Sequence, residues 1–552
     1  MKKKILPVIV VICLIIVVGA VGILTSIVEK YTPSEERLDS REYFMLDAED
    51  EAALVIDREL KEEKVKIIDG RFYMEDAIVG KYINSRFYWD EQQEIMLYSL
   101  PTEVVQMVPE EADPDFVFWR SVGDTFYLDL EFISEVSPIE YKVYEEPARV
   151  VIQNEAEGLK IVTALEDCVI RQKGGIKSLI VDDIAKDEQM YLEEEMENWS
   201  RVSTKDGYVG YVENDSISAV ETVSLDFDKE LPEYTSIQKD YKINLAWHQV
   251  TSMAANDGLD SVLENTQGLN TISPTWFSVI DNDGTISSLA SASYVEKAHA
   301  AGLEVWGLID NFSSNADTLT FLSSTKARNY IIQQLIEEAE RVGLDGINLD
   351  FESITQTQAP HYVQFIRELS VACRLNGLVF SIDNPVPMSY NQYYNLKEQG
   401  IVADYVIIMG YDEHYAGSAE AGSVASIGFV KNGIIDTLKE VPAEKVINGI
   451  PFYTRLWIES FGGGVTSEVF GMNGALNYIK QNGMDTYWDT EVGQTVATLE
   501  GDDALYTIWL EDDQSIAEKM KLIQEYDLAG VAAWKLGLES DSVWSVISQY
   551  LQ

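Results

Sequence analysis

Two carboxylates stand at alternate positions close to the end of an apolar run. The segment reads Leu-Asp-Gly-Ile-Asn-Leu-Asp-Phe-Glu over residues 344–352. Because side chains alternate across a strand, Asn348, Asp350 and Glu352 share one face and the apolar residues between them share the other. Like charges in a low-dielectric site raise one pKa, and that carboxyl group can then act as a general acid. We therefore predict that Glu352 donates a proton to a leaving oxygen while Asp350 holds and polarises the substrate.

These groups need a scaffold, and the second half of the chain has the pattern of one. Strand patterns alternate with helical patterns over residues 241–552. Eight strands are predicted, over residues 243–247, 271–279, 304–309, 346–351, 379–382, 405–409, 446–450 and 530–534. This alternation is typical of an α/β fold, the (β/α)8 TIM barrel, whose active sites lie at the carboxyl ends of the strands. The long gap at about 452–515 predicts a β-rich insertion that forms one wall of a cleft.

The carboxylate strand resembles the Asp-Gly-x-Asp-x-Asp-x-Glu signature of glycoside hydrolase family 18, the chitinase-like barrel enzymes. The resemblance implies retaining cleavage of β-1,4 bonds next to N-acetylglucosamine, with the 2-acetamido oxygen of the substrate as nucleophile. It implies the acid/base role for Glu352 and the orientation of the acetamido group for Asp350. Asp345 matches the first Asp of the signature, whereas Asn348 stands where the family usually has Asp. Asn348 is expected to hydrogen-bond Asp350 without sharing a proton as an acid.

Three other strand ends agree with this resemblance. Met409-Gly-Tyr411-Asp412 matches the family's Met-x-Tyr-Asp, in which the tyrosine aligns the acetamido carbonyl. Tyr453 ends a segment that resembles the end of the family's seventh strand, and Trp534 closes the eighth, where the family has a tryptophan as the floor of the sugar subsite. The resemblance is greatest to the bacterial spore-germination and cortex-lytic branch.

The chain begins with three lysines and an uncharged apolar run, Ile5 to Val28. At about 1.5 Å per residue this run is long enough to span the ~30 Å hydrocarbon core of a membrane. We predict that residues 1–29 are a cytoplasmic tip and an uncleaved signal anchor, with the rest of the chain outside the cytoplasm. A cleaved signal peptide is the alternative. An acidic stalk is predicted over 30–59.

Residues 60–155 predict a duplicated small α+β module. The segment 69–74 has an echo at 123–128. Within the module, residues 77–90 resemble the domain named after the amino terminus of copper amine oxidase, which is found in bacterial wall-associated proteins.

Residues 160–220 predict a small all-β barrel. Two alternating runs around a Lys-Asp-Gly turn over 199–212 predict its hairpin. This hairpin resembles that of the bacterial Src-homology-3-like domain, whose aromatic residues either bind a wall peptide or glycan or fill the small core. A linker follows over 221–240. We expect the front modules to contact the cell wall.

Composition excludes several classes of function. The chain has 41 basic and 93 acidic side chains and a net charge of -52, which disfavours nucleic acid as a partner. The three cysteines are too few and too far apart to form a disulfide framework. No cofactor or metal site is expected, because no metal-ligand spacing is found among the histidines, His248, His299, His361 and His414.

The sequence therefore predicts a glycosidase, anchored in the cell membrane by a single span, that acts on peptidoglycan or a related glycan. A chitinase or chitooligosaccharide hydrolase is one alternative. The other is a non-catalytic glycan-binding wall protein on the same barrel. Proteins of that kind typically lack the acid, so Glu352 favours the enzyme.

Overall fold

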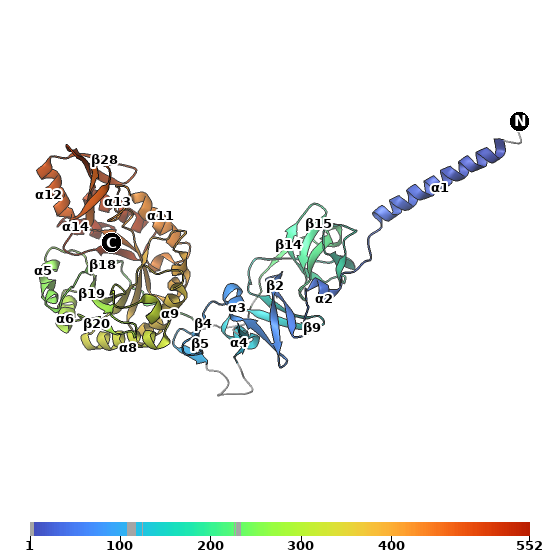
Figure 1. Cartoon of the computed structure of the whole chain (residues 1–552), viewed down its shortest axis with the longest axis horizontal. Coiled ribbons are helices and arrows are strands. Elements are labelled where there is room, and N and C mark those ends of the chain that lie inside the picture. Colours follow the sequence, from blue (N-terminus) through green and yellow to red (C-terminus); the bar gives the residue numbers. More distant parts are fainter. Residues whose placement is uncertain (1–4, 108–117, 124, 226, 228–232, 552) are drawn as a thin grey trace. The chain divides into compact units, whose positions relative to one another are not determined.

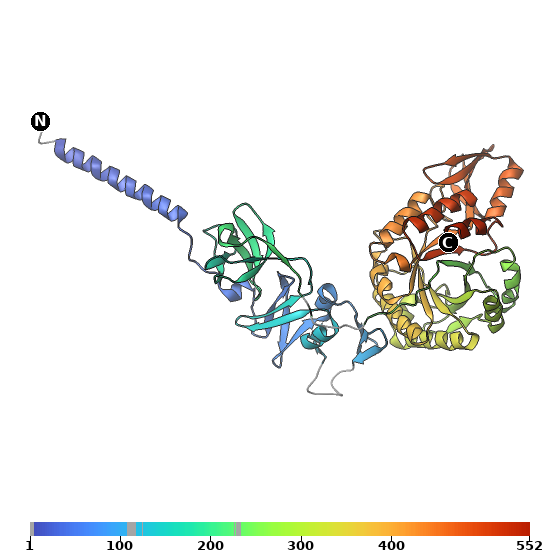
Figure 2. The same cartoon turned by 180° about the vertical axis from the view of Figure 1, so that it is seen from behind.

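A computed structural model describes residues 5–107, 118–123, 125–225, 227 and 233–551, and the side chains of all of these except 5–8, 22–24, 26 and 27. The chain divides into two compact units, which Figure 1 shows with their elements labelled and Figure 2 shows from behind. The first unit consists of Met1–Phe87 and Met107–Leu231, and the second of Tyr88–Gln106 and Pro232–Gln552.

The second unit contains a closed barrel of eight parallel strands. They are β18 (Ile243–His248), β19 (Thr271–Val279), β21 (Glu304–Asp310), β22 (Gly346–Asp350), β23 (Val379–Pro385), β24 (Tyr405–Met409), β25 (Val446–Pro451) and β31 (Gly530–Trp534). The ring closes because β18 pairs with both β19 and β31. A short strand, β20 (Ile286–Ser288), adds to β19 in antiparallel direction. The predicted TIM barrel is confirmed.

Helices surround this barrel, as both views show (Figures 1 and 2). They are α5 (Leu259–Leu263), α6 (Ala292–Ala300), α7 (Thr318–Leu322), α8 (Thr325–Val342), α9 (Ala359–Leu375), α10 (Leu396–Val402), α11 (Ile427–Thr437), α13 (Asp513–Glu525) and α14 (Val543–Tyr550). In α8, Ile331, Leu335 and Ala339 recur at four-residue spacing and are buried, which is the apolar stripe expected of a helix on a sheet. The helix ends at Gly343, whose φ of 81° is the left-handed conformation common at helix ends.

An insertion follows β25, where the sequence predicts one. It is an antiparallel sheet in the order β27-β26-β30-β29-β28 with one helix, α12 (Met472–Asn482). Its strands are β26 (Tyr453–Ser460), β27 (Val465–Gly471), β28 (Asp485–Asp489), β29 (Gln494–Glu500) and β30 (Ala504–Trp509). The insertion has a small core of its own, which includes Leu456, Ala497 and Ile508.

A three-stranded sheet from the front of the chain belongs to the barrel unit. Its strands are β4 (Phe87–Asp90), β5 (Ile95–Ser99) and β6 (Val104–Met107). Asp90 accepts a hydrogen bond of 2.9 Å from the Thr325 amide, and the Gln364 amide donates one of 3.3 Å to Ser99. This differs from the continuous module predicted over 60–155. Residues 88–106 belong with the barrel because their polar groups form buried hydrogen bonds with α8 and α9. Local sequence patterns do not reveal pairing between residues so far apart in the chain.

The first unit begins with a helix and two sheets follow. The helix, α1 (Ile5–Tyr31), lies where the anchor is predicted, and a short helix, α2 (Ser40–Tyr43), comes next. Within the part of the chain that the structure describes, no helix combines the length and the apolar character needed to cross a membrane. The anchor therefore stays a prediction.

The first sheet has the order β7-β8-β3-β2-β1-β10-β9. Its strands are β1 (Glu51–Ile56), β2 (Glu59–Ile68), β3 (Arg71–Glu75), β7 (Trp119–Val122), β8 (Thr125–Asp129), β9 (Glu140–Glu145) and β10 (Ala148–Gln153). Helix α3 (Asp76–Tyr82) follows β3 and α4 (Leu130–Val136) follows β8, so the same strand–helix pair occurs twice. The predicted stalk over 30–59 differs from this, because β1 is a buried inner strand of the sheet.

The second sheet has the order β13-β12-β16-β15-β14-β11-β17. Its strands are β11 (Leu159–Thr163), β12 (Cys168–Arg171), β13 (Ile180–Ile184), β14 (Gln189–Glu195), β15 (Trp199–Ser203), β16 (Val209–Glu213) and β17 (Glu221–Val223). The predicted hairpin is confirmed, because β15 pairs with β16 from Trp199–Glu213 to Ser203–Val209. Tyr208 in its turn is buried in the core. The two resemblances predicted for the front modules stay predictions.

Candidate active site

Strand β22 places its polar side chains inside the barrel. Ile347, Leu349 and Phe351 belong to the core cluster that includes the apolar side chains of α8 and α9, and each is at most 1% exposed. Asn348 and Asp350 therefore point to the opposite, inner face, as the alternation of side chains predicts. Glu352 follows the last residue of the strand, at its carboxyl end.

A cavity of about 440 Å³ opens at this end of the barrel. Seven of the predicted site residues line it: Asp350, Glu352, Met409, Tyr411, Asp412, Tyr453 and Trp534. They come from β22, β24, β26 and β31 or from the loops that follow. The lining also includes residues that the sequence did not single out, among them Trp247, Phe312, Asp383, Tyr390 and Tyr415.

Asp345 lies elsewhere. It precedes β22, and its Oδ2 accepts a hydrogen bond of 2.8 Å from the Val305 amide and lies 2.8 Å from His299 Nε2. Because it stands at the amino-terminal end of the strand, Asp345 does not line the cavity. Its contacts join β22 to β21 and to the end of α6.

Asn348 is fully buried, and its amide is saturated with partners. Its Oδ1 accepts hydrogen bonds from Trp247 Nε1 at 2.9 Å and Ser273 Oγ at 3.0 Å. Its Nδ2 donates to Ser381 Oγ at 3.1 Å and to Asp383 Oδ1 at 2.8 Å. The expected hydrogen bond from Asn348 to Asp350 is wrong, because the amide is directed at the neighbouring strand β23.

Asp350 and Asp383 are two buried carboxyl groups in one site. Burial, and then the charges of Asp383, Glu352 and Asp310, raise the pKa of Asp350 well above its usual range. Burial also raises the pKa of Asp383 to about 8, although the hydrogen bond from Asn348 opposes this shift. Asp350 Oδ1 is buried without a hydrogen-bond partner. The pair therefore holds at least one proton at neutral pH.

Asp383 and Asp310 are two carboxyl groups of the site that sequence reasoning missed. The predicted strand ended at residue 382, whereas β23 continues to Pro385. Asp383 stands two residues after Ser381 and therefore on the same face, so parity along a longer strand is the signal for it. Asp310 ends β21 opposite Asp350 and accepts a hydrogen bond of 2.6 Å from Ser278 Oγ.

The Glu352 side chain lines the cavity, and two hydrogen bonds hold its backbone. The Glu352 amide donates to Asn311 Oδ1 at 3.0 Å, and Asn311 Nδ2 donates back to the Glu352 carbonyl at 3.0 Å. Partial burial, and then the charges of Asp412 and Asp310, raise the pKa of Glu352 above its ordinary value. A carboxyl group that keeps its proton closer to neutral pH is suited to general acid catalysis.

Tyrosine and tryptophan side chains surround the carboxyl groups. Tyr453 Oη donates a hydrogen bond of 2.6 Å to Asp412 Oδ1, and the Tyr411 and Tyr453 ring centres are 6.2 Å apart, edge to face. The Trp534 ring centre lies 5.9 Å from that of Trp247. On the rim, three large aromatic side chains are more than half exposed: Phe312, Tyr390 and Tyr415.

A closed barrel with several carboxyl groups at the carboxyl ends of its strands is the arrangement of a barrel enzyme that performs acid–base chemistry. The model of the family "Glycosyl hydrolases family 18" matches residues 208–539, which is more than half of the chain. The protein belongs to glycosyl hydrolase family 18 and is a glycosidase.

Similar proteins include two from Bacillus subtilis. The chain is 27% identical over 292 residues to the uncharacterized glycosylase YvbX. The alignment covers 50% of this chain and 84% of that protein. It is 27% identical over 235 residues to a cortical fragment-lytic enzyme, covering 41% of this chain and 54% of that enzyme.

Solved structures share the fold. The spore cortex-lytic enzyme SleL of Bacillus cereus has a TM-score of 0.51 at 20% identity, covering 59% of this chain and 79% of that one. A chitinase of Chromobacterium violaceum has a TM-score of 0.50 at 22% identity, covering 56% of this chain and 99% of that one.

Proposed function

We propose that this glycosidase cleaves β-1,4 linkages next to N-acetylglucosamine in peptidoglycan or a related glycan, with retention and with assistance from the substrate's acetamido group. The observation that carries the proposal is one cavity that contains both Glu352, with its raised pKa, and the buried pair of Asp350 and Asp383. The exposed rim aromatics support a sugar ligand, because an aromatic face packs well against the C–H face of a sugar ring.

In the proposed mechanism Glu352 donates its proton to the glycosidic oxygen as the bond to the anomeric carbon breaks. The acetamido oxygen of the substrate attacks that carbon from the other side and forms a cyclic intermediate. Asp350, kept protonated beside Asp383, hydrogen-bonds the acetamido group, and Tyr411 aligns its carbonyl. Glu352, now ionised, then takes a proton from the water that opens the intermediate.

The choice of substrate rests on the relatives of this chain and not on the geometry of the barrel. One relative is a cortical fragment-lytic enzyme, which favours peptidoglycan. Others include a probable endochitinase of Caenorhabditis elegans, so chitin is the second candidate. We further propose that α1 anchors the protein in the cell membrane and that the front modules contact the wall. The apolar run from Ile5 to Val28 supports the anchor.

A Glu352→Gln variant tests the catalytic proposal. Because glutamine keeps the shape of the side chain but cannot donate the carboxyl proton, we expect kcat to fall by about 10²- to 10⁴-fold. Glu338→Gln, in an ion pair with Arg341 on α8 and outside the cavity lining, is the matched control and should retain the parent rate. A Glu352→Gln variant that cleaves or clears glycan as well as the parent would contradict the hydrolase and leave the non-catalytic glycan-binding protein.

The substrate is decided by parallel digests of purified wall sacculi and chitin oligomers, with the new reducing ends identified by mass. Release of fragments that end in N-acetylglucosamine from sacculi, with slower release from chitin, is the expected result. The reverse order would make the protein a chitinase.

A further inference from the structure

One loop carries much of one side of the cavity. It comprises residues 410–426, between β24 and α11, and we name it the cavity loop. Tyr411, Asp412, Glu413 and Tyr415 of this loop line the cavity. The loop folds back on itself, so that its second limb, residues 423–426, pairs with its first limb. Contacts that hold the second limb therefore also determine the positions of the side chains that line the cavity.

Hydrogen bonds join the two limbs of the cavity loop. The Glu413 amide donates to the Val424 carbonyl at 2.9 Å, and the His414 amide donates to the Ser423 carbonyl at 3.2 Å. The Ser426 amide donates to Glu413 Oε2 at 2.9 Å. The position of residues 423–426 therefore fixes Glu413 and, next to it, Asp412.

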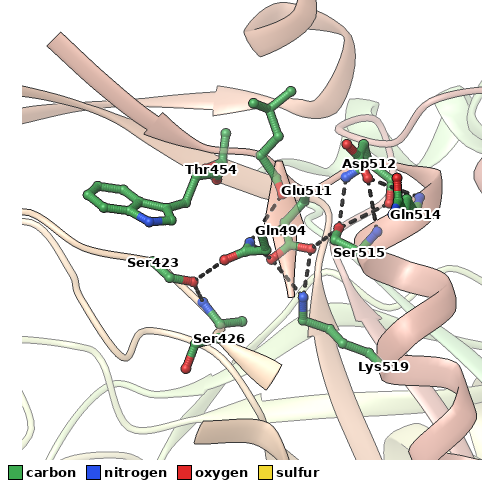
Figure 3. Close-up of polar contacts among 12 residues, drawn as sticks. Ser423, Ser426, Thr454, Gln494, Glu511, Asp512, Gln514, Ser515 and Lys519 are labelled. Carbon is green, nitrogen blue, oxygen red and sulfur yellow. Dashed lines mark hydrogen bonds and ion pairs between the residues drawn. The ribbon is translucent and has the colours of Figure 1, made fainter. Parts of the chain in front are cut away.

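The second limb is bonded to the insertion through Ser423 and Gln494 (Figure 3). Both residues are buried, and Ser423 Oγ donates to Gln494 Oε1. Gln494 begins β29, and its Nε2 donates to Glu511 Oε1 at 2.7 Å and to the Leu510 carbonyl at 3.1 Å. The insertion thus holds the cavity loop by a side-chain contact.

A buried ion pair, Glu511–Lys519, determines which way the side-chain amide of Gln494 is oriented. Lys519 Nζ lies 3.0 and 2.9 Å from the two carboxylate oxygens of Glu511, and Ser515 Oγ donates to Glu511 Oε2 at 2.8 Å (Figure 3). Glu511 and Lys519 are 0% and 1% exposed. An ionised carboxylate only accepts hydrogen bonds, so Gln494 must turn its NH2 group to Glu511 and its oxygen to Ser423.

We propose that Gln494 and the Glu511–Lys519 pair are positioning residues for the hydrolysis, which hold the cavity loop so that Asp412 stays beside Glu352. The inference rests on the proposed function, because it concerns the placement of a group around the proposed acid. Stability alone is a weak explanation for such a pair, since apolar replacements of a buried ion pair are often equally stable.

Positioning and stability predict different results. Burial is the largest cause of the raised pKa of Glu352, and the charges of Asp412 and Asp310 add to it. If the cavity loop shifts and Asp412 moves away, Glu352 loses its proton at lower pH. The alkaline limb of the pH profile of kcat/KM must then move to lower pH, because a general acid works only while it is protonated.

The test replaces both charges, Glu511→Met with Lys519→Met, in the full chain. We expect a folded protein whose alkaline limb moves to lower pH and whose KM for an N-acetylglucosamine oligomer rises roughly three- to tenfold, the effect of losing one buried hydrogen bond. Binding of the same oligomer, measured by calorimetry in a Glu352→Gln background, should weaken by the same factor. The matched control is Arg367→Met with Glu398→Met, a buried pair outside the cavity lining.

A folded double variant with the KM, affinity and pH limbs of the parent would overturn the proposal. If the double variant does not fold, Ser423→Ala, which deletes the donor to Gln494 together with the acceptor of the Ala425 amide, is judged by the same readouts. A parent that neither cleaves nor binds any such glycan would overturn the proposed function and this inference with it. An active parent with unchanged variants would overturn this inference alone.

Discussion

At the scale of single residues, the side-chain nitrogen of Asn348 affects the charge of the site, because an oxygen in its place would belong to a second carboxyl group next to Asp383. Its Nδ2 donates to Asp383 Oδ1 at 2.8 Å, and its Oδ1 receives two donors. A carboxylate at this position would face another carboxyl group at the same short distance. Both groups cannot be ionised there, so one proton would have to be held between them.

An Asn348→Asp variant should therefore lose stability as pH rises. The new carboxyl pKa is raised in the folded state above its unfolded value of about 4, so the folded state holds the extra proton and stability falls through the range up to the folded pKa. We expect the Tm deficit relative to the parent to be larger at pH 8 than at pH 5. For a pKa raised by two units the whole loss, from below pH 4 to pH 8, is about 3 kcal/mol, and about half of it falls between pH 5 and pH 8.

Asn348→Ser is the control for this prediction. It removes hydrogen bonds without adding a charge, so its Tm deficit should change much less between pH 5 and pH 8 than that of Asn348→Asp. An Asn348→Asp deficit that does not change with pH would contradict the proton held between residues 348 and 383.

At the scale of elements, the start of α8 depends on a residue far away in sequence. Asp90 at the end of β4 accepts from the Thr325 amide at 2.9 Å, in addition to the cap that Ser324 supplies to Ala327. The first amides of a helix have no partner within the helix, and a side-chain acceptor stabilises them.

We expect Asp90→Ala to lower the local stability of the first turn of α8 by about 1 kcal/mol. Amide hydrogen exchange of a peptide covering this turn, measured by mass spectrometry, should become faster by roughly fivefold. Asp129→Ala is the control. The Asp129 side chain accepts hydrogen bonds from the Glu131 and Phe132 amides at the start of α4, and its removal should leave hydrogen exchange in α8 unchanged. Unchanged exchange in Asp90→Ala would show that Ser324 alone determines this helix start.

At the scale of the whole molecule, the barrel unit is not continuous in sequence. Residues 88–106 bring it several buried partners: Arg328 Nη1 lies 3.2 Å from Tyr88 Oη, and Arg374 Nη1 donates to the Pro101 carbonyl at 2.7 Å. Arg328 also forms a buried ion pair with Glu368. Loss of partners around a buried charge is costly because that charge has no solvent to replace them.

A chain of residues 232–552 alone should therefore have a lower Tm than the barrel unit in the full chain. Addition of a peptide of residues 88–106 in excess should recover part of the difference, because a ligand that binds the folded state stabilises it. Differential scanning calorimetry with and without the peptide measures both effects. Equal Tm values and no response to the peptide would show that the segment is dispensable for the barrel.

Much of the catalytic unit follows from the sequence by itself. Periodicity placed all eight barrel strands, and alternation placed Asn348, Asp350 and Glu352 on the inner face, because both patterns depend only on local geometry. The net charge of -52 disfavours nucleic acid as a partner without reference to any structure.

The tertiary structure decided the pairings between distant residues. It directed Asn348 to Asp383 rather than to Asp350, placed Asp345 outside the cavity, and joined residues 88–106 to the barrel. The pairing of Asn348 with Asp383 and the joining of residues 88–106 to the barrel have no local signal. Hydrogen bonds and burial act between atoms that are close in space, and only the folded chain brings together residues that are far apart in sequence.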